Sequence, residues 1–260
     1  MLDGLSPARR RTVLAVAAVV VLAAVAVVAA ALLRARGAGD PVAQDRPGPV
    51  LLVAGYGGST RALDPVRDQL AGEGRTVVVV PALAGNTGDL DAQADALGRA
   101  AERALDDTEA GSVDVVGYSA GGVVARLWVR DHGGDAVARR VLTIGSPHHG
   151  TDLAALARGL AGTCPKACEQ LEPDSALLRS LDAGDETPAG PRWVSVWSTA
   201  DRVVVPADSA RLAGALDLTV QQLCPGARTS HGGLPGHPAV LAVVRAALGA
   251  GPVGVPRPSC

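Results

Sequence analysis

The sequence predicts an α/β domain in which a mostly parallel sheet is covered by helices on both faces. Short apolar runs without polar alternation have the length of buried strands and lie at residues 50–54, 76–80, 113–116, 140–144 and 193–197. Amphipathic stretches of helical length separate these runs. Strands and helices that alternate along a chain are typical of parallel sheets.

The predicted helices follow from apolar side chains that recur at helical spacing. They cover residues 61–71, 89–107, 121–130 and 238–248. A shorter helix is expected around 173–181, since a proline is favourable in a first helical turn. Residues 216–222 are a candidate for one more strand.

Composition excludes two classes of protein. The chain has 260 residues, of which 48% are hydrophobic, and a formal net charge of -2. A disordered chain would be more polar, and a nucleic-acid-binding domain would be basic, so neither class is expected. The chain contains 32 glycines and no phenylalanine, which indicates a core of small aliphatic side chains connected by many turns.

The N-terminal segment predicts membrane targeting. Arg9, Arg10 and Arg11 precede an apolar run over residues 13–33, long enough as a helix to cross a hydrocarbon core of about 30 Å. Residues 1–36 are therefore either an uncleaved anchor, which the length favours, or a cleaved signal peptide. The arginines would stay in the cytoplasm, which places the rest of the chain at the outer face of the membrane or, after cleavage, in a secreted form.

A linker and a single globular domain complete the predicted organisation. Residues 37–48 contain glycines and prolines and are expected to form the linker. Residues 49–260 would form the domain, with a cap-like insertion at about 150–190 that has little strand character. Its apolar side chains could cover the active site or simply pack on the sheet.

The strongest chemical motif lies between the third predicted strand and the helix that follows it. Gly117-Tyr118-Ser119-Ala120-Gly121 has the G-x-S-x-G form of a nucleophile elbow. The sharp turn would expose the Ser119 hydroxyl, and the flanking Gly117 and Gly121 leave room for it. Ser119 is therefore the predicted nucleophile.

A serine nucleophile needs a base, and the base needs an acid that fixes its tautomer. Asp201 follows the strand at 193–197 and is the predicted acid. Asp208 and Asp217 are interpreted as ordinary loop residues. The expected chain order of serine, acid and histidine places the base near the C-terminus.

Two histidines compete for the role of base. His231 lies in a loop, whereas His237 directly precedes a proline and belongs to the approach to the last helix, so His231 is preferred. The pair His148-His149 has no accompanying ligand cluster at metal-binding spacing. No metal and no cofactor are expected.

These motifs, with Gly145-Ser146-Pro147-His148-His149-Gly150-Thr151 and His231-Gly232-Gly233-Leu234, resemble small secreted bacterial lipases of the α/β-hydrolase fold, including actinobacterial and Bacillus-type enzymes. The resemblance spans roughly residues 49 to 248. It implies the same triad of Ser119, Asp201 and His231. It also implies an oxyanion hole made by the backbone N–H groups of Tyr56 and Ala120.

The four cysteines are expected to form disulfides, because the domain is predicted to lie outside the cytoplasm. The preferred pairs among three arrangements are Cys164 with Cys168, which are near neighbours, and Cys224 with Cys260, which would hold the C-terminal tail.

The sequence thus predicts a monomeric carboxylic ester hydrolase of the triacylglycerol lipase or carboxylesterase type. Its substrate would be a lipid or a small ester, cleaved through an acyl-serine intermediate. Two alternatives stay open: acyl transfer to an alcohol of the cell envelope, and a non-catalytic binding module with a vestigial triad.

Overall fold

The computed structural model describes residues 16, 20, 21 and 42–260. The chain divides into two units, Met1–Pro41 and Val42–Cys260, and the second holds the whole domain. Nearly all of the apolar run predicted to enter the membrane lies outside the described residues. Within the part that is described, no helix is long and apolar enough to cross a membrane.

Six parallel strands form one sheet in the order β2-β1-β3-β4-β5-β6. Their bounds are β1 Val50–Val53, β2 Val77–Val79, β3 Val113–Tyr118, β4 Ala138–Ile144, β5 Arg192–Trp197 and β6 Leu216–Thr219. The five apolar runs are therefore strands, and residues 216–222 divide into β6 and the short helix α8 (Val220–Leu223). Because all strands are parallel, their carboxyl ends lie at one edge.

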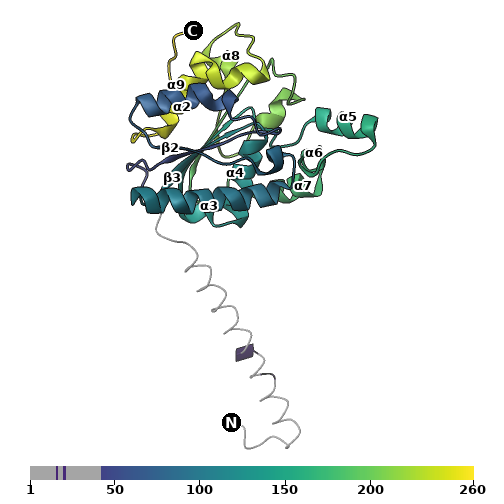
Figure 1. The fold of residues 1–260 in the computed structure, drawn as a ribbon, viewed down its shortest axis with the longest axis horizontal. Helices are drawn as coiled ribbons and strands as arrows, with labels where there is room; N and C mark the ends of the chain where they lie inside the picture. Colours follow the sequence, from purple (N-terminus) through teal and green to yellow (C-terminus); the bar gives the residue numbers. More distant parts are fainter. Residues whose placement is uncertain (1–15, 17–19, 22–41) are drawn as a thin grey trace, which may run out of the picture. The chain divides into compact units, whose positions relative to one another are not determined.

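Helices cover both faces of this sheet (Figure 1). On one face lie α3 (Leu90–Thr108) and α4 (Ala120–Asp131), and on the other lie α2 (Asp64–Gly72) and α9 (Pro238–Leu248). Alternate residues of β1 enter the two cores, with Leu51 among the α3 and α4 side chains and Leu52 among those of α2 and α9. Burial on both faces explains why the strand sequences lack polar alternation.

The predicted insertion between β4 and β5 contains three helices: α5 (Asp152–Ala161), α6 (Lys166–Gln170) and α7 (Ala176–Asp182). The helix expected at 173–181 corresponds to α7, whereas α5 and α6 were not distinguished from the sequence. Both preferred disulfides are formed, Cys164–Cys168 beside α6 and Cys224–Cys260 at the tail.

In residues 42–260, five 3-10 turns connect these elements: η1 (Arg61–Leu63), η2 (Leu83–Asn86), η3 (Gly134–Ala136), η4 (Ala207–Ala210) and η5 (His231–Gly236). Two of these turns lie at the carboxyl edge of the sheet, where ligands bind in open α/β folds. η2 follows the carboxyl end of β2, and His231 at the start of η5 lies beside Gly145, directly after β4.

Candidate active site

Ser119 occupies a strained turn between β3 and α4. Its φ of 54° and ψ of -128° are rare for a residue with a side chain. A Cβ at Gly117 would lie 2.6 Å from the backbone of Gly122, and one at Gly121 would collide with the Val53 carbonyl. Only glycine fits at these two positions, so the G-x-S-x-G motif has the geometry of a nucleophile elbow.

Asp201 and His231 form a buried pair. The His231 Nδ1 lies 2.6 Å from Asp201 Oδ2, and the two residues are 8% and 5% exposed. Asp201 Oδ1 accepts hydrogen bonds from the backbone N–H groups of Val203 (2.8 Å) and Val204 (3.1 Å). Because the carboxylate fixes the proton on Nδ1, Nε2 is the nitrogen left to accept another.

The electrostatics of Asp201 favour its charged form. Burial alone would raise the pKa of this carboxyl group, but the hydrogen bond and charge of His231 and the two backbone N–H groups lower the pKa below its usual value. Asp201 is therefore ionised at neutral pH and can stabilise a positively charged imidazole.

Ser119 and His231 both lie next to the carboxyl end of β4. The Ser119 N–H donates to the Ile144 carbonyl at 2.9 Å, and a Cβ on the next residue, Gly145, would lie 3.4 Å from the His231 ring. Among the described residues, no hydrogen bond joins Ser119 Oγ to His231. Hydrogen bonds between a catalytic nucleophile and its base are often long when no substrate is bound.

Tyr118 also contacts His231, through both its ring and its hydroxyl. Its ring stacks on that of His231 with centroids 5.1 Å apart, and its hydroxyl donates to the His231 carbonyl at 3.2 Å. Burial and the nearby Asp201 carboxylate raise the pKa of Tyr118 to about 12, so the hydroxyl keeps its proton. Tyr118 was given no role in the sequence analysis, although it lies within the serine motif.

The two amides expected to form the oxyanion hole lie near Ser119. A Cβ on Gly55 would come within 2.8 Å of Ser119 Cβ, so the peptide that carries the Tyr56 N–H lies beside the nucleophile. The Ala120 N–H belongs to the first residue of α4. Neither N–H donates to another group in the described part of the chain, which leaves both available to an oxyanion.

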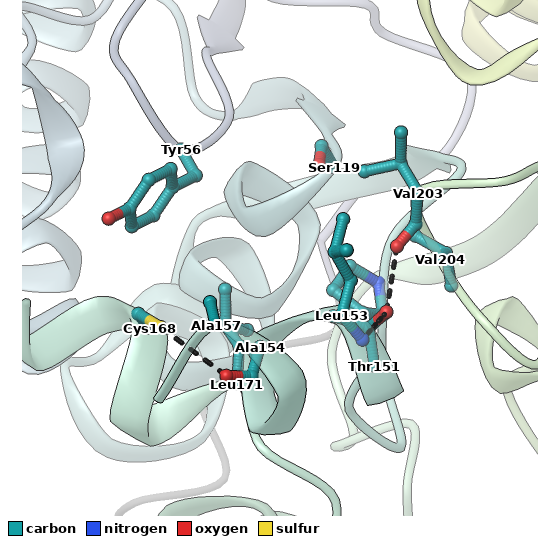
Figure 2. A pocket seen from close by; sticks show the side chains of 11 residues that line it. Tyr56, Ser119, Thr151, Leu153, Ala154, Ala157, Cys168, Leu171, Val203 and Val204 are labelled. Atoms are coloured by element: carbon teal, nitrogen blue, oxygen red, sulfur yellow. Dashed lines mark hydrogen bonds between the residues drawn. The ribbon is translucent and has the colours of Figure 1, made fainter. Parts of the chain in front are cut away.

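A cavity of about 230 Å³ opens beside Ser119 and is almost entirely apolar (Figure 2). It is lined by Tyr56, Ser119, Pro147, Thr151, Leu153, Ala154, Ala157, Cys168, Leu171, Val203 and Val204. Helices α5 and α6 supply much of this lining. The insertion therefore has both roles considered from the sequence: Leu171 and residues of α5 line the cavity, whereas Leu178 and Leu181 of α7 pack in the core.

Two of the alternative residues, His237 and Asp217, have structural partners. His237 caps α9, where its Nδ1 accepts from the Ala239 N–H at 3.2 Å. Asp217 accepts from the Trp197 indole at 3.1 Å, and exposed Asp208 lies in η4. His148 is fully buried and lies 3.1 Å from the Thr143 hydroxyl through Nε2.

Within the described residues, one group of side chains has a composition that could hold a metal ion: His149, Asp182 and Glu186, whose ligand atoms lie within 4.8 Å of one another. These atoms already have partners. Asp182 pairs with Arg126 at 2.9 Å, and Glu186 lies 3.2 Å from His149 and accepts from the Ala213 N–H. The buried Arg126 guanidinium beside the cluster makes it unfavourable for a cation.

Solved structures share this fold. Lipase B from Aspergillus fumigatus superposes with a TM-score of 0.69 at 22% identity, covering 80% of this chain and 54% of its own. The mature lipase BlEst2 from Bacillus licheniformis gives a TM-score of 0.59 at 19% identity, covering 76% of this chain and 89% of its own. The present chain thus spans about half the length of the Aspergillus protein. The two likenesses define an α/β-hydrolase fold.

A family model matches part of the sequence. Residues 102–222 match the family model described as Lipase (class 2). No curated protein matches the chain. The partial family match and the fold agree with the resemblance to lipases that the sequence motifs predicted.

Proposed function

We propose that the protein hydrolyses carboxylic esters of lipids through an acyl intermediate on Ser119. The observation that carries this proposal is the buried Asp201–His231 pair beside the end of β4, the same strand end to which the strained Ser119 turn is hydrogen-bonded. A serine hydroxyl is a weak nucleophile unless such a base accepts its proton.

The proposed reaction has two balanced halves. His231 Nε2 takes the Ser119 proton while Oγ attacks the ester carbonyl, and the N–H groups of Tyr56 and Ala120 hold the oxyanion. The proton then passes to the departing alcohol, leaving acyl-Ser119. Water, deprotonated by His231, attacks this ester, and the acid product leaves as Ser119 regains its proton. Asp201 stabilises the imidazolium in both halves.

Two features support a lipid substrate. The lining of the cavity beside Ser119 is apolar, which suits an acyl chain. Helix α5 also exposes three leucines at helical spacing, with 44% of Leu153, 56% of Leu156 and 81% of Leu160 accessible to solvent. Leu153 itself lines the cavity, so the exposed apolar face continues to its opening. This face would contact the alkyl chains of aggregated lipid.

We propose further that the domain functions outside the cytoplasm, attached through residues 1–36 or secreted. The two disulfides support this location, since structural disulfides persist in oxidising compartments. The Arg-headed apolar run at 13–33 supports it independently. Fusion of a reporter enzyme active only outside the cytoplasm to Cys260 would give signal in intact cells, and a signal from cytoplasmic reporters alone would contradict the location.

A fluorophosphonate probe tests the serine mechanism. It should form a covalent adduct with the full chain in detergent, and peptide mapping should place the adduct on Ser119. Ser119→Ala should lose labelling, whereas Ser175→Ala, which removes a helix-capping hydroxyl of α7, should retain it. Labelling at another serine, or equal labelling of Ser119→Ala, would contradict the proposal.

A further inference from the structure

We propose that Asn86 is a positioning residue that aims the Tyr56 N–H at the oxyanion. The inference rests on the proposed ester hydrolysis and assigns a role to a residue of η2, 33 positions before the nucleophile. Asn86 is buried, with 5% of its surface exposed. It lies outside the serine, aspartate and histidine motifs.

Every polar atom of the Asn86 side chain is used within this region. Its Nδ2 donates to the carbonyls of Ala54 (3.2 Å) and Gly55 (3.4 Å), and its Oδ1 accepts from the Leu83 N–H at 3.1 Å. The loop after β2 is thereby joined to the loop after β1. A buried amide with these partners would leave unpaired groups behind if it were removed.

The contact to Gly55 has a direct consequence for Tyr56, because the Gly55 carbonyl and the Tyr56 N–H belong to the same peptide unit. This unit is planar and trans, so the two groups point in opposite directions. A hydrogen bond that fixes the carbonyl therefore fixes the direction of the N–H. The Gly55 carbonyl also accepts from the Gly58 N–H at 3.1 Å, which closes the turn on the other side.

The same peptide lies against the nucleophile. A Cβ on Gly55 would come within 2.8 Å of Ser119 Cβ and 3.3 Å of Ser119 Oγ. A rotation of this peptide would move the Tyr56 N–H relative to the attacked carbonyl without moving Ser119. Oxyanion donors act only when they are held at the position that the oxyanion will occupy.

The backbone around Asn86 is strained in a way that serves this contact. Ala84, Gly85 and Asn86 have φ values of 47°, 63° and 54°, all in the left-handed region. Asparagine tolerates this region better than most residues with a side chain. A Cβ on Gly58 would lie 3.0 Å from the Gly85 backbone, so the two loops are also packed closely. The strained segment turns the Asn86 amide toward the loop after β1.

Two substitutions distinguish the contribution of the Asn86 backbone conformation from that of its side-chain hydrogen bonds. Asn86→Gly keeps the left-handed conformation but removes the amide. Asn86→Asp keeps the shape and the acceptor for Leu83 but removes both donors. Each variant should lose about 10- to 100-fold in kcat on a p-nitrophenyl ester, with KM within about twofold of wild type, because the oxyanion forms only in the transition state.

An alkyl boronic acid gives an independent readout, since its serine adduct is a tetrahedral anion. Its affinity should fall in parallel with kcat in both variants. Thr87→Ala is the matched control, because among the described residues the half-buried Thr87 hydroxyl donates only to the Ala84 carbonyl within the same loop, and this variant should behave as wild type.

The inference would be overturned if both Asn86 variants kept kcat and boronate affinity within about twofold of wild type. It would also be overturned if kcat, KM and the melting temperature all changed together, since that is the pattern of a structural role. A wild type that hydrolyses no ester would overturn the proposed function itself, and is distinguished by the absence of activity before any substitution.

Discussion

The two carboxylate oxygens of Asp201 have different partners. Oδ2 accepts from His231, while Oδ1 accepts from the N–H groups of Val203 and Val204. The two bonds to Oδ1 hold the carboxylate in place within the loop. The bond to Oδ2 can therefore hold the imidazole in one orientation. This division explains how an aspartate in an otherwise irregular loop can orient a histidine 30 residues away.

Asp201→Asn tests this role at the residue scale. The asparagine keeps the shape but can hold the wrong tautomer of His231, so kcat should fall by about 10³- to 10⁴-fold. Asp208→Asn, in the same segment but exposed, should leave kcat unchanged. Steady-state kinetics on a soluble ester would decide, and equal activity of the two variants would remove Asp201 from the triad.

At the scale of elements, the strands and the serine turn could be predicted from the sequence, because local sequence patterns determine both. The apolar runs located the strands, and the glycines at 117 and 121 located the serine turn, because close packing there admits no side chain. The roles of Asn86 and Tyr118 were missed, since both depend on partners distant in sequence: Asn86 contacts Ala54, and Tyr118 contacts His231. No periodicity reveals such contacts.

Helix α5 offers a prediction about the substrate surface. Leu156→Ser with Leu160→Ser should reduce hydrolysis of emulsified long-chain esters several-fold, because less apolar surface would meet the lipid. Hydrolysis of a soluble short-chain ester should be unchanged. Val255→Ser, in the C-terminal tail and 60% exposed, is the control. A matching loss on both substrates would mean that α5 supports the fold and does not contact lipid.

The stability that the contact between α3 and α4 contributes should depend on pH. His132, after the end of α4, lies 2.9 Å from Asp91 and 2.8 Å from Asp95 of α3. Burial opposes the charged ring, but the two carboxylates outweigh it and raise the pKa of His132 above its usual value. The charged ring binds the carboxylates only in the folded state, so its contribution is complete below the unfolded pKa of about 6.5 and is lost as pH rises through the higher folded pKa.

Thermal unfolding between pH 5.5 and 9 measures this contribution. The stability of the wild type relative to His132→Gln should decrease as pH rises across the titration of the folded ring. A difference between the two proteins that is constant over this range would contradict the effect.

At the scale of the whole domain, the C-terminal tail is fastened at two places. The buried guanidinium of Arg139 donates to the carbonyls of Leu248 and Gly249 and pairs with Asp114. Further along, Cys260 is bonded to Cys224 across 36 residues. None of these residues lines the cavity beside Ser119. We therefore expect the tail to contribute to stability and not to the chemistry.

Cys260→Ser should consequently lower the free energy of unfolding by about 2 to 4 kcal/mol, since it opens a long loop in the unfolded state. Denaturant titration under non-reducing conditions measures the change, with Val255→Ser as the control in the same tail. Activity on a soluble ester should stay at the wild-type level. A large loss of activity in the folded variant would show that the tail acts on the site.

Hydrolysis of p-nitrophenyl esters from acetate to palmitate, by the full chain and by Ser119→Ala, tests the central claim most directly. We expect the wild type to turn over the series and to favour chains long enough to fill the apolar cavity, while Ser119→Ala loses at least about 10³-fold in kcat. Equal rates for the two proteins, or no turnover of any ester by a folded wild type, would contradict an acyl-Ser119 mechanism.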